Sequence, residues 1–303
     1  MASAAPSLDF DRSFAPQTGQ AIAVAEGIIR VTAPNASAYT YTGTNAFLLG
    51  HERLAVLDPG PDDDAHLDAL KRTIAGRPVD AIILSHTHRD HSALALRLAR
   101  EVDAPLWFGG PHRLSRPLRR FERNPIARSC DWDLMPDLTL LDGQSIMAGD
   151  LPLTVHTTPG HCANHLAFST GEVLLSGDHV MGWNSTLVSV PDGSMADYFA
   201  SLDKVIALPQ RLYLPAHGAA IADGPAYAQA LRAHRQMRNQ QVLDAVAAGA
   251  KTIAAVVAAI YPQQSLPVRL AAAMTINAHV EYLEELGQLR VKRGPLGMRI
   301  HVP

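Results

Sequence analysis

Four apolar segments of this chain each run into a histidine or an aspartate, and this recurrence constrains the fold more than any other feature. The first segment, Val79–Leu84, is followed by three histidines and an aspartate within the run Ser85–His91. Short apolar runs bounded by polar residues are typical of buried strands. Residues just beyond such strands lie on loops held by a rigid scaffold, where functional side chains concentrate. Imidazole and carboxylate groups at this spacing favour a metal site over a solvated polar loop.

Three later segments repeat the arrangement, each accompanied by glycine or proline. They end in Thr-Pro-Gly-His, Ser-Gly-Asp-His and Leu-Pro-Ala-His-Gly, which place His161, Asp178 and His217 after a strand. Extended stretches at Ala21–Val31 and Asn45–Leu57 precede them and are predicted as strands. Helical spacing covers 64–75, 92–101 and 195–208. This order predicts a mixed α/β fold with ligand-type residues at four strand ends.

The motifs HTHRDH, TPGH, SGDH and LPAHG, with Asp58-Pro59-Gly60-Pro61 upstream, resemble those of the metallo-β-lactamase superfamily over residues 20–222. The resemblance implies an α/β (α+β) fold, the four-layer αββα metallo-β-lactamase sandwich, with the site at one edge between two sheets. It also implies two divalent metal ions, zinc by expectation, with Mn²⁺ or Fe²⁺ accepted by the same ligands. The implied ligands are His86, His88 and His161 for the first metal, Asp90, His91 and His217 for the second, and Asp178 as the bridge.

The same motifs separate this chain from antibiotic-hydrolysing class B1 enzymes. Those enzymes place a cysteine at the second metal and lack the bridging aspartate, whereas here Asp178 is present and Cys162 comes one position too late. The resemblance is to the branch that contains thioesterases, lactonases and RNA-processing nucleases. We expect a dinuclear zinc hydrolase that cleaves a thioester, lactone or other small ester with metal-activated hydroxide. Asp90 would be its catalytic carboxylate, and Asp58 either a second-shell acceptor for a metal histidine or a turn residue.

A change of character near residue 222 predicts a second domain. Residues 1–20 are predicted to form an N-terminal arm and 21–222 the catalytic domain. The rest, 223–303, has helical stretches at 227–248, 252–261 and 267–289, followed by a hairpin around a Gly-Pro turn. This order is typical of a small helical winged-helix domain. A winged helix on this core resembles the LACTB2-like subgroup, whose animal members are endoribonucleases.

Alternative functions follow from that domain and from the metals. Specific DNA recognition is unlikely because the third helix carries Glu281, Glu284 and Glu285, which repel phosphates. Cleavage of single-stranded RNA stays open as the LACTB2-like alternative. A mononuclear iron persulfide dioxygenase shares the scaffold, and the complete second set of metal ligands disfavours it. Apolar C-terminal helices leave a homodimer possible.

Two segments are candidates for contact with substrate. The segment 182–186 follows the Asp178 strand, and its Trp183 and Asn184 are predicted to overhang the metals. The segment 112–128 holds six arginines against one glutamate. Arg119 and Arg120 within it would bind an anionic substrate, although a solvated helical face is the commoner meaning of such a run. His156, His165 and His179 are predicted to pack or to form hydrogen bonds without ligating.

Composition sets outer limits on function. The 303 residues carry a net charge of −3, which gives no general attraction to nucleic acid or to an anionic membrane. No apolar run approaches the roughly 20 residues that span a bilayer. The first residues lack the basic start and apolar block of a secretory signal. With only Cys130 and Cys162, no disulfide framework is expected, and a cytoplasmic location is the prediction.

Overall fold

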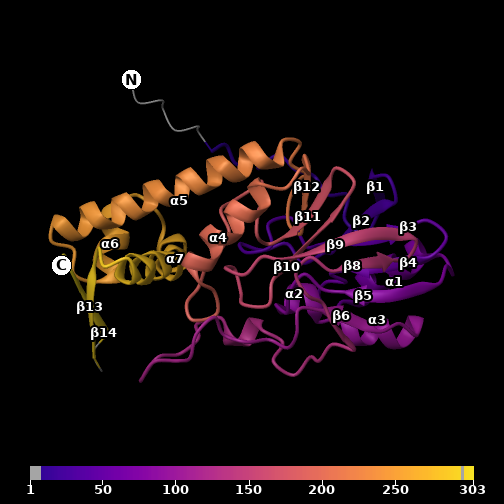
Figure 1. Ribbon diagram of the computed structural model, residues 1–303, viewed down its shortest axis with the longest axis horizontal. Coiled ribbons are helices and arrows are strands. Elements are labelled where there is room, and N and C mark those ends of the chain that lie inside the picture. Colours follow the sequence, from indigo (N-terminus) through magenta and orange to yellow (C-terminus); the bar gives the residue numbers. More distant parts are fainter. Residues whose placement is uncertain (1–7, 295–296) are drawn as a thin grey trace.

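Two β-sheets packed face to face, with helices on both outer faces, form the main body of the computed structural model, which describes residues 8–294 and 297–303 (Figure 1). The first sheet has seven strands in the order β1-β2-β3-β4-β5-β6-β7, and the second has five in the order β12-β11-β10-β9-β8. The expected mixed α/β sandwich is therefore confirmed. The first sheet comprises β1 (Ala21–Ala25), β2 (Ile28–Thr32), β3 (Asn45–Gly50), β4 (Leu54–Leu57), β5 (Val79–Ile83), β6 (Leu106–Phe108) and β7 (Leu138–Thr139).

The first two expected strands are each a hairpin, which corrects the prediction of single strands. β1 pairs antiparallel with β2, and β3 with β4. Gly27 turns the first hairpin with a φ of 66°, and Gly50 enters the second with a φ of 111°. Glycine adopts these left-handed angles without the clash that a Cβ causes. At Gly50 a Cβ would lie 2.1 Å from the Arg53 carbonyl oxygen.

Helices α1 (Asp64–Ile74) and α3 (Ala95–Val102) cover the outer face of the first sheet. Asp63 caps α1 by accepting a hydrogen bond from the His66 amide, and Leu67, Leu70 and Ile74 turn inward. The helix predicted over 92–101 is α3, which begins at Ala95, and a further short helix, α2 (Arg89–Ser92), forms inside the ligand-rich loop before it. Asp90 and His91 therefore lie on a separate short helix.

The second sheet packs against the first through an apolar layer and is covered outside by helices α4 and α5. The layer between the sheets includes Phe47, Ile83, Val155 and Phe168, all buried. The elements of this half are β8 (Ser145–Ala148), β9 (Leu151–Thr157), β10 (Leu166–Thr170), β11 (Val173–Gly177), β12 (Leu212–Pro215) and α4 (Met195–Ile206). The short 3-10 helix η1 (Ala127–Ser129) lies in the connection between β6 and β7 of the first sheet.

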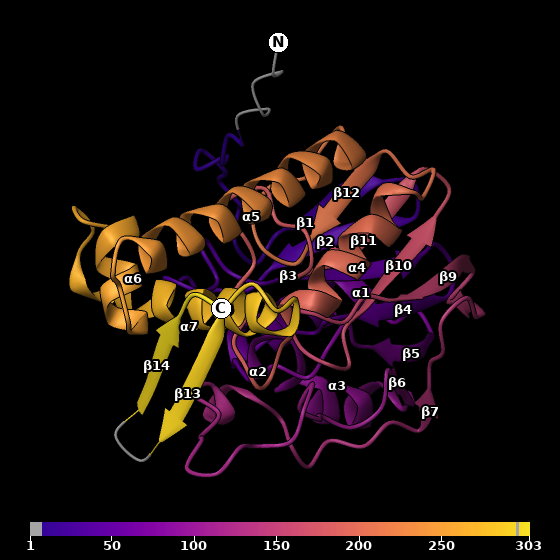
Figure 2. The ribbon, with the colours of Figure 1, turned by 60° about the vertical axis from the view of Figure 1, so that its left-hand side comes forward.

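Beyond residue 223 the chain is helical and closes in a hairpin. α5 (Gly224–Ala247) runs over α4, and α6 (Ile253–Ile260) and α7 (Leu266–Glu285) follow (Figure 2). β13 (Arg290–Gly294) and β14 (Gly297–His301) pair antiparallel. Residues such as Val242, Val256 and Val280 enclose an apolar core of their own. The Gly-Pro turn predicted in this hairpin falls partly on 295–296, outside the described residues, and the winged-helix assignment stays a prediction.

The N-terminal segment contacts the body of the protein where it is described. Residues 1–7 of the predicted arm lie outside the described residues. The Asp11 amide donates a hydrogen bond to the Gly182 carbonyl (2.9 Å), and the Phe14 ring lies 4.8 Å from the Arg30 guanidinium carbon. Across 8–294 and 297–303, no helix combines the length and apolarity needed to span a membrane.

Candidate metal centre

All seven predicted ligands meet at one edge of the sandwich. His86 and His88 follow β5, Asp90 and His91 lie on α2, His161 follows β9, Asp178 follows β11, and His217 follows β12. These strand ends belong to both sheets, so the sandwich itself brings together residues that are up to 131 positions apart, from 86 to 217.

Three imidazoles form the first group. The Nε2 atom of His86 lies 3.0 Å from Nδ1 of His88, and Nε2 of His161 lies 2.8 Å from that same Nδ1. All three side chains are buried, with at most 6% of each residue exposed. Three ring nitrogens facing one point are a typical set of zinc ligands.

Two imidazoles and two carboxylates form the second group. Nε2 of His217 lies 3.3 Å from Asp90 Oδ2 and 3.3 Å from Asp178 Oδ1. Nε2 of His91 lies 3.4 Å from Asp90 Oδ2 and 3.7 Å from Asp178 Oδ2. The Oδ2 atom of Asp178 also lies 3.5 Å from His161 Nε2, so this carboxylate touches both groups.

The outer nitrogen of each imidazole is held by a neighbouring acceptor. His91 Nδ1 donates to Asp58, His161 Nδ1 to the Leu187 carbonyl (2.7 Å) and His217 Nδ1 to the Gly43 carbonyl (3.1 Å). His88 Nε2 donates to Asp192, and His86 Nδ1 to the Ser85 hydroxyl. An outer nitrogen that donates carries the proton, which leaves the inner nitrogen with a free lone pair. When all five rings are neutral, five lone pairs therefore converge.

Several of the inner atoms make no hydrogen bond to any described residue. His91 Nε2, His217 Nε2 and Asp178 Oδ1 are buried without a hydrogen bond among the described residues. Buried polar groups are nearly always paired, so a cluster of such atoms calls for an additional group. Lone pairs from imidazole and carboxylate fit one or two divalent cations. The residues present therefore match the metal chemistry that the motifs imply.

The electrostatics divide the centre into two parts. In the first group, burial and the neighbouring imidazoles lower the pKa of His86, and burial lowers that of His161 to about 4. In the second group, burial opposes charge, but the Asp178 and Asp90 carboxylates still raise the pKa of His217 to about 10. Metal ions must displace a proton there, because ligating imidazole is neutral.

Asp58 is placed to hold the ligand loop. Its Oδ1 accepts from the Ser85 amide (2.7 Å), and its Oδ2 accepts from the Ser85 hydroxyl (2.6 Å) and from His91 Nδ1 (3.1 Å). Its backbone has a φ of 50°, an angle that aspartate tolerates better than most residues. The two predicted roles, acceptor for a histidine and turn residue, therefore coexist at one position.

One buried carboxylate that the sequence did not single out lies behind the first group. Asp192 is fully buried, and its oxygens accept from His88 Nε2 (3.0 Å) and from His112 Nε2 (2.9 Å). Burial opposes its charge, but hydrogen bonds from both imidazoles hold its pKa well below the usual range. Cys130 Sγ lies 3.6 Å from the same carboxylate.

A cavity of about 810 Å³ opens beside the centre. Trp183 and Asn184 line it, as their predicted position implies, and the Trp183 ring stacks on Tyr41 with centroids 5.0 Å apart. Helix α7, from the C-terminal part of the chain, supplies a further wall. The lining includes His88, Asp90, His161 and Asp178 from the centre, the arginines Arg89 and Arg128, and the apolar side chains of Ile126, Met181, Leu187, Leu270 and Met274.

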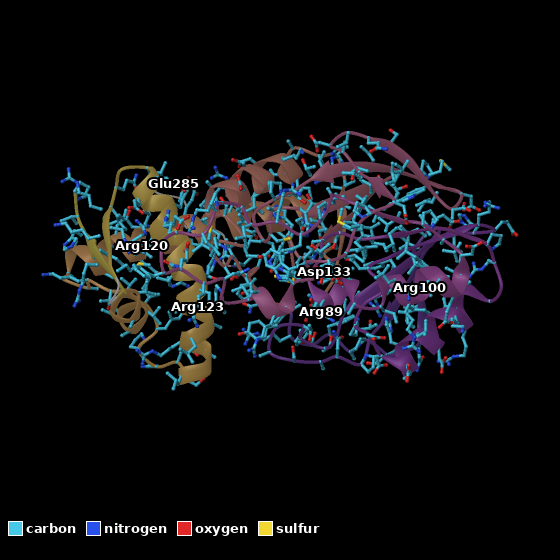
Figure 3. The ribbon with its side chains drawn as sticks, turned by 90° about the horizontal axis from the view of Figure 1, so that it is seen from below. Arg89, Arg100, Arg120, Arg123, Asp133 and Glu285 are labelled. Carbon is cyan, nitrogen blue, oxygen red and sulfur yellow. The ribbon has the colours of Figure 1, made fainter. Side chains whose placement is uncertain are left out.

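The described lining contains neither Arg119 nor Arg120, which corrects their predicted position. Arg119 donates a hydrogen bond to Glu281 of α7 (2.5 Å), and the Arg120 guanidinium carbon lies 4.7 Å from the Phe121 ring. In Figure 3, Arg120 lies near the C-terminal elements, whereas Arg89, the first residue of α2, lies apart from it on the main body. Spacing along the segment cannot reveal that α7 supplies the carboxylate that holds Arg119.

The three histidines near the motifs that were predicted not to ligate contact protein groups. His156 Nε2 lies 2.8 Å from the Ser169 hydroxyl. His165 pairs with Thr158 through Nδ1 (2.8 Å) and accepts from the Asp178 amide through Nε2 (3.1 Å). His179 is buried against the Tyr198 ring, with centroids 4.8 Å apart. His165 therefore orients the backbone of the residue expected to bridge two metals.

A two-sheet sandwich with a buried His/Asp centre at its edge is the architecture of a metal-dependent hydrolase. The model of the Metallo-beta-lactamase superfamily matches residues 39–217, and the chain belongs to that superfamily as one of its metallo-hydrolases. A beta-lactamase-like protein 2 homolog from Drosophila melanogaster is 30% identical over 88% of this chain and 90% of its own length.

A second sequence relative and one solved structure are also similar to this chain. An atrochrysone carboxyl ACP thioesterase from Aspergillus chevalieri is 28% identical over 72% of this chain, which spans 65% of that protein. The crystal structure of a beta-lactamase domain protein from Burkholderia ambifaria superposes with a TM-score of 0.80, at 24% identity, over 98% of this chain and 97% of that one. That likeness shows that the fold extends across both parts of the chain.

Proposed function

We propose that this protein is a dinuclear, zinc-dependent hydrolase of thioesters or related small esters. The single observation that carries the proposal is the convergence of five imidazole lone pairs and two carboxylates beside a cavity. His86, His88 and His161 would hold one cation, Asp90, His91 and His217 the other, and Asp178 would contact both. Bound divalent cations would lower the pKa of water and polarise the carbonyl that is attacked.

The protein groups have separate tasks in this scheme. Asp58 and Asp192 hold the rings of His91 and His88, so that their inner nitrogens stay aimed at the cations. Asp90 is partly exposed and lines the cavity, which places a carboxylate where it can orient a water molecule. The imidazoles of His91 and His217 outweigh the effect of burial and hold its pKa well below the usual range, so Asp90 is ionised at neutral pH.

The cavity supports an amphiphilic substrate. Its walls expose more apolar than polar surface, with Ile126, Leu187 and Leu270 among the lining residues, and this surface suits an apolar acyl group. Arg89 and Arg128 lie on the same lining and are exposed, so they can meet an anionic group through their planar guanidinium forks. An acyl thioester with a negatively charged carrier or carboxylate combines both features.

Single-stranded RNA is the second candidate, favoured by the C-terminal hairpin. Arg290, Lys292 and Arg299 are exposed there, and such residues attract phosphate. Against it stands the mostly apolar cavity wall. The resemblance to the LACTB2-like subgroup supports this candidate, whereas the thioesterase among the relatives supports the first.

The experiment compares purified zinc-loaded protein on acyl thioesters, lactones and single-stranded RNA. The proposal expects thioester turnover that is lost when His86 and His88 are both replaced by alanine, and that persists in His51→Ala, a change at an exposed histidine outside the centre. RNA cleavage without thioester turnover would favour the second candidate. Full thioester turnover by the double variant would refute the metal mechanism.

A further inference from the structure

Helix α5 carries a buried cation that the proposed catalytic scheme leaves unexplained. Arg235 is 2% exposed, its guanidinium donates a hydrogen bond to the Thr186 carbonyl, and its carbon atom lies 5.3 Å from the centre of the Tyr198 ring. Among the described residues, its Nε has no partner and no carboxylate faces it. Burying an unpaired cation costs stability, so packing alone does not account for an arginine here.

The carbonyl that Arg235 holds belongs to a segment in contact with the metal centre. The Thr186 hydroxyl donates to the carbonyls of Asp178 (2.8 Å) and His179 (2.9 Å). The next residue, Leu187, accepts the hydrogen bond from His161 Nδ1 at 2.7 Å. The segment 183–187 therefore reaches the backbone of one expected ligand and the ring of another.

The same segment also forms part of the cavity. Trp183, Asn184, Ser185 and Leu187 line it. In Figure 2, α5 lies along α4 on the outside of the second sheet. Arg235 thus reaches inward from the C-terminal part of the chain to a segment that faces the site on its other side.

We propose that Arg235 is a positioning residue for the first metal. By holding the Thr186 carbonyl, it fixes the peptide plane between Thr186 and Leu187 and, through it, the direction of the Leu187 carbonyl. That carbonyl keeps the proton of His161 on Nδ1, so that Nε2 stays free to ligate. The inference rests on the proposed metal centre and assigns α5 a part in building it.

The test measures zinc binding by the full-length chain in competition with a chromophoric chelator. Arg235→Met is expected to weaken binding of one of the two zinc ions by about tenfold, the lower end of the effect of changes behind a metal ligand. Arg238→Met is the matched control. Arg238 lies on the same helix, with its guanidinium 4.6 Å from the Tyr261 ring and one hydrogen bond to Gln241, and among the described residues it has no hydrogen bond to 183–187.

A rescue experiment separates positioning from general loss of stability. Methylguanidinium at millimolar concentration is expected to restore part of the zinc affinity of Arg235→Met and to leave the wild type and Arg238→Met unchanged. If Arg235→Met does not fold, Arg235→Lys replaces it, because lysine keeps the charge but lacks the fork. That variant is expected to lose affinity at least threefold.

The outcomes distinguish this inference from the function it rests on. A wild type that binds no zinc at all would remove the proposed function itself. A wild type that binds two zinc ions, with a folded Arg235→Met or Arg235→Lys that binds them equally tightly, would overturn only the role of Arg235. Loss of affinity in Arg238→Met as large as in Arg235→Met would also overturn it, because the effect would then belong to α5 as a whole.

Discussion

Single hydrogen bonds from the outer imidazole nitrogens hold the rings of the centre in place. Asp192 is the clearest case, because one buried carboxylate serves both His88 and His112. The Asn124 side-chain amide donates a hydrogen bond of 3.1 Å to Asp192 Oδ1, the oxygen that also accepts from His112. A ligand whose ring is free to rotate loses the alignment that its lone pair needs.

We therefore predict that Asp192→Asn weakens zinc binding about 10- to 100-fold, because the amide holds the His88 proton less firmly than a carboxylate does. The measurement is chelator competition at neutral pH. Asp133→Asn, at an exposed aspartate labelled in Figure 3, serves as the control and should bind zinc like the wild type. Unchanged affinity in Asp192→Asn would show that His88 is oriented by other contacts.

A single exposed arginine of the cavity lining, Arg128, is placed to bind an anionic group of the substrate. Arg128→Glu is predicted to raise KM about tenfold or more for a thioester that carries a carboxylate and to leave KM for a neutral thioester nearly unchanged, since only the former loses an ionic contact. Steady-state kinetics on the matched pair of substrates measure this. Arg100→Glu, on α3 and away from the cavity lining, is the control. Equal changes for both substrates would argue against an anionic substrate group.

At the scale of elements, α7 joins the two parts of the chain into one site. Leu270, Ala271 and Met274 line the cavity, and Leu270 exposes 63% of its surface. Leu270→Asp is predicted to lower kcat/KM for long-chain acyl thioesters by about 10- to 100-fold and to spare acetyl thioesters, which do not reach the wall. The dependence of kcat/KM on acyl length is the measurement.

Leu286→Asp provides the control for that helix. Leu286 follows the last turn of α7, is 52% exposed and lies outside the cavity lining. It should keep the acyl-length profile of the wild type. A Leu270→Asp variant with the same profile as Leu286→Asp would mean that acyl groups do not lie against α7.

The sequence predicted some strands and some site residues correctly, and it missed others for physical reasons. Apolar runs ending in histidine or aspartate located strands β5, β9, β11 and β12, and the resemblance of the motifs that follow them implied the set of residues at the centre, because each motif is local. The sequence does not mark Asp192 as a site residue, because it lies 104 positions from His88, in a Pro-Asp-Gly sequence that also suits an ordinary turn. Leu187 and Gly43 accept from the ligand histidines through carbonyl oxygens, and the residue type does not reveal such a backbone contact.

At the scale of the whole molecule, the predicted boundary at residue 222 separates two apolar cores only in part. The cluster around Tyr198 and Leu202 of α4 continues into Ala228 and Leu231 of α5 and Ala278 of α7. An ion pair of Arg116 with Glu281 ties the arginine-rich segment to α7 as well. The two parts therefore share packing, polar contacts and one cavity. The C-terminal helices stabilise the first part of the chain and complete the wall of the cavity.

Buried neutral histidines make the free energy of unfolding decrease as the pH falls. Burial lowers the pKa of His66 in α1 to about 4, from an ordinary value of 6.5. The unfolded chain binds this proton more readily, so the stability that neutral His66 contributes is complete above pH 6.5 and is lost as pH falls towards 4. At pH 5 the loss from this residue amounts to about 2 kcal/mol.

We predict that His66→Gln, measured by urea unfolding of the metal-free protein, reduces the loss of unfolding free energy between pH 7.5 and 5.0 by about that amount, about 2 kcal/mol. His51→Gln is the opposite case, because the hydrogen bonds that this exposed histidine donates to the Glu26 and Asp150 carboxylates raise its pKa. Protonated His51 favours folding as pH falls, so its replacement should not reduce the loss. Parallel pH profiles for the wild type and His66→Gln would show that His66 is protonated without unfolding, and acid sensitivity would then arise from other buried imidazoles, among them His234 and His279.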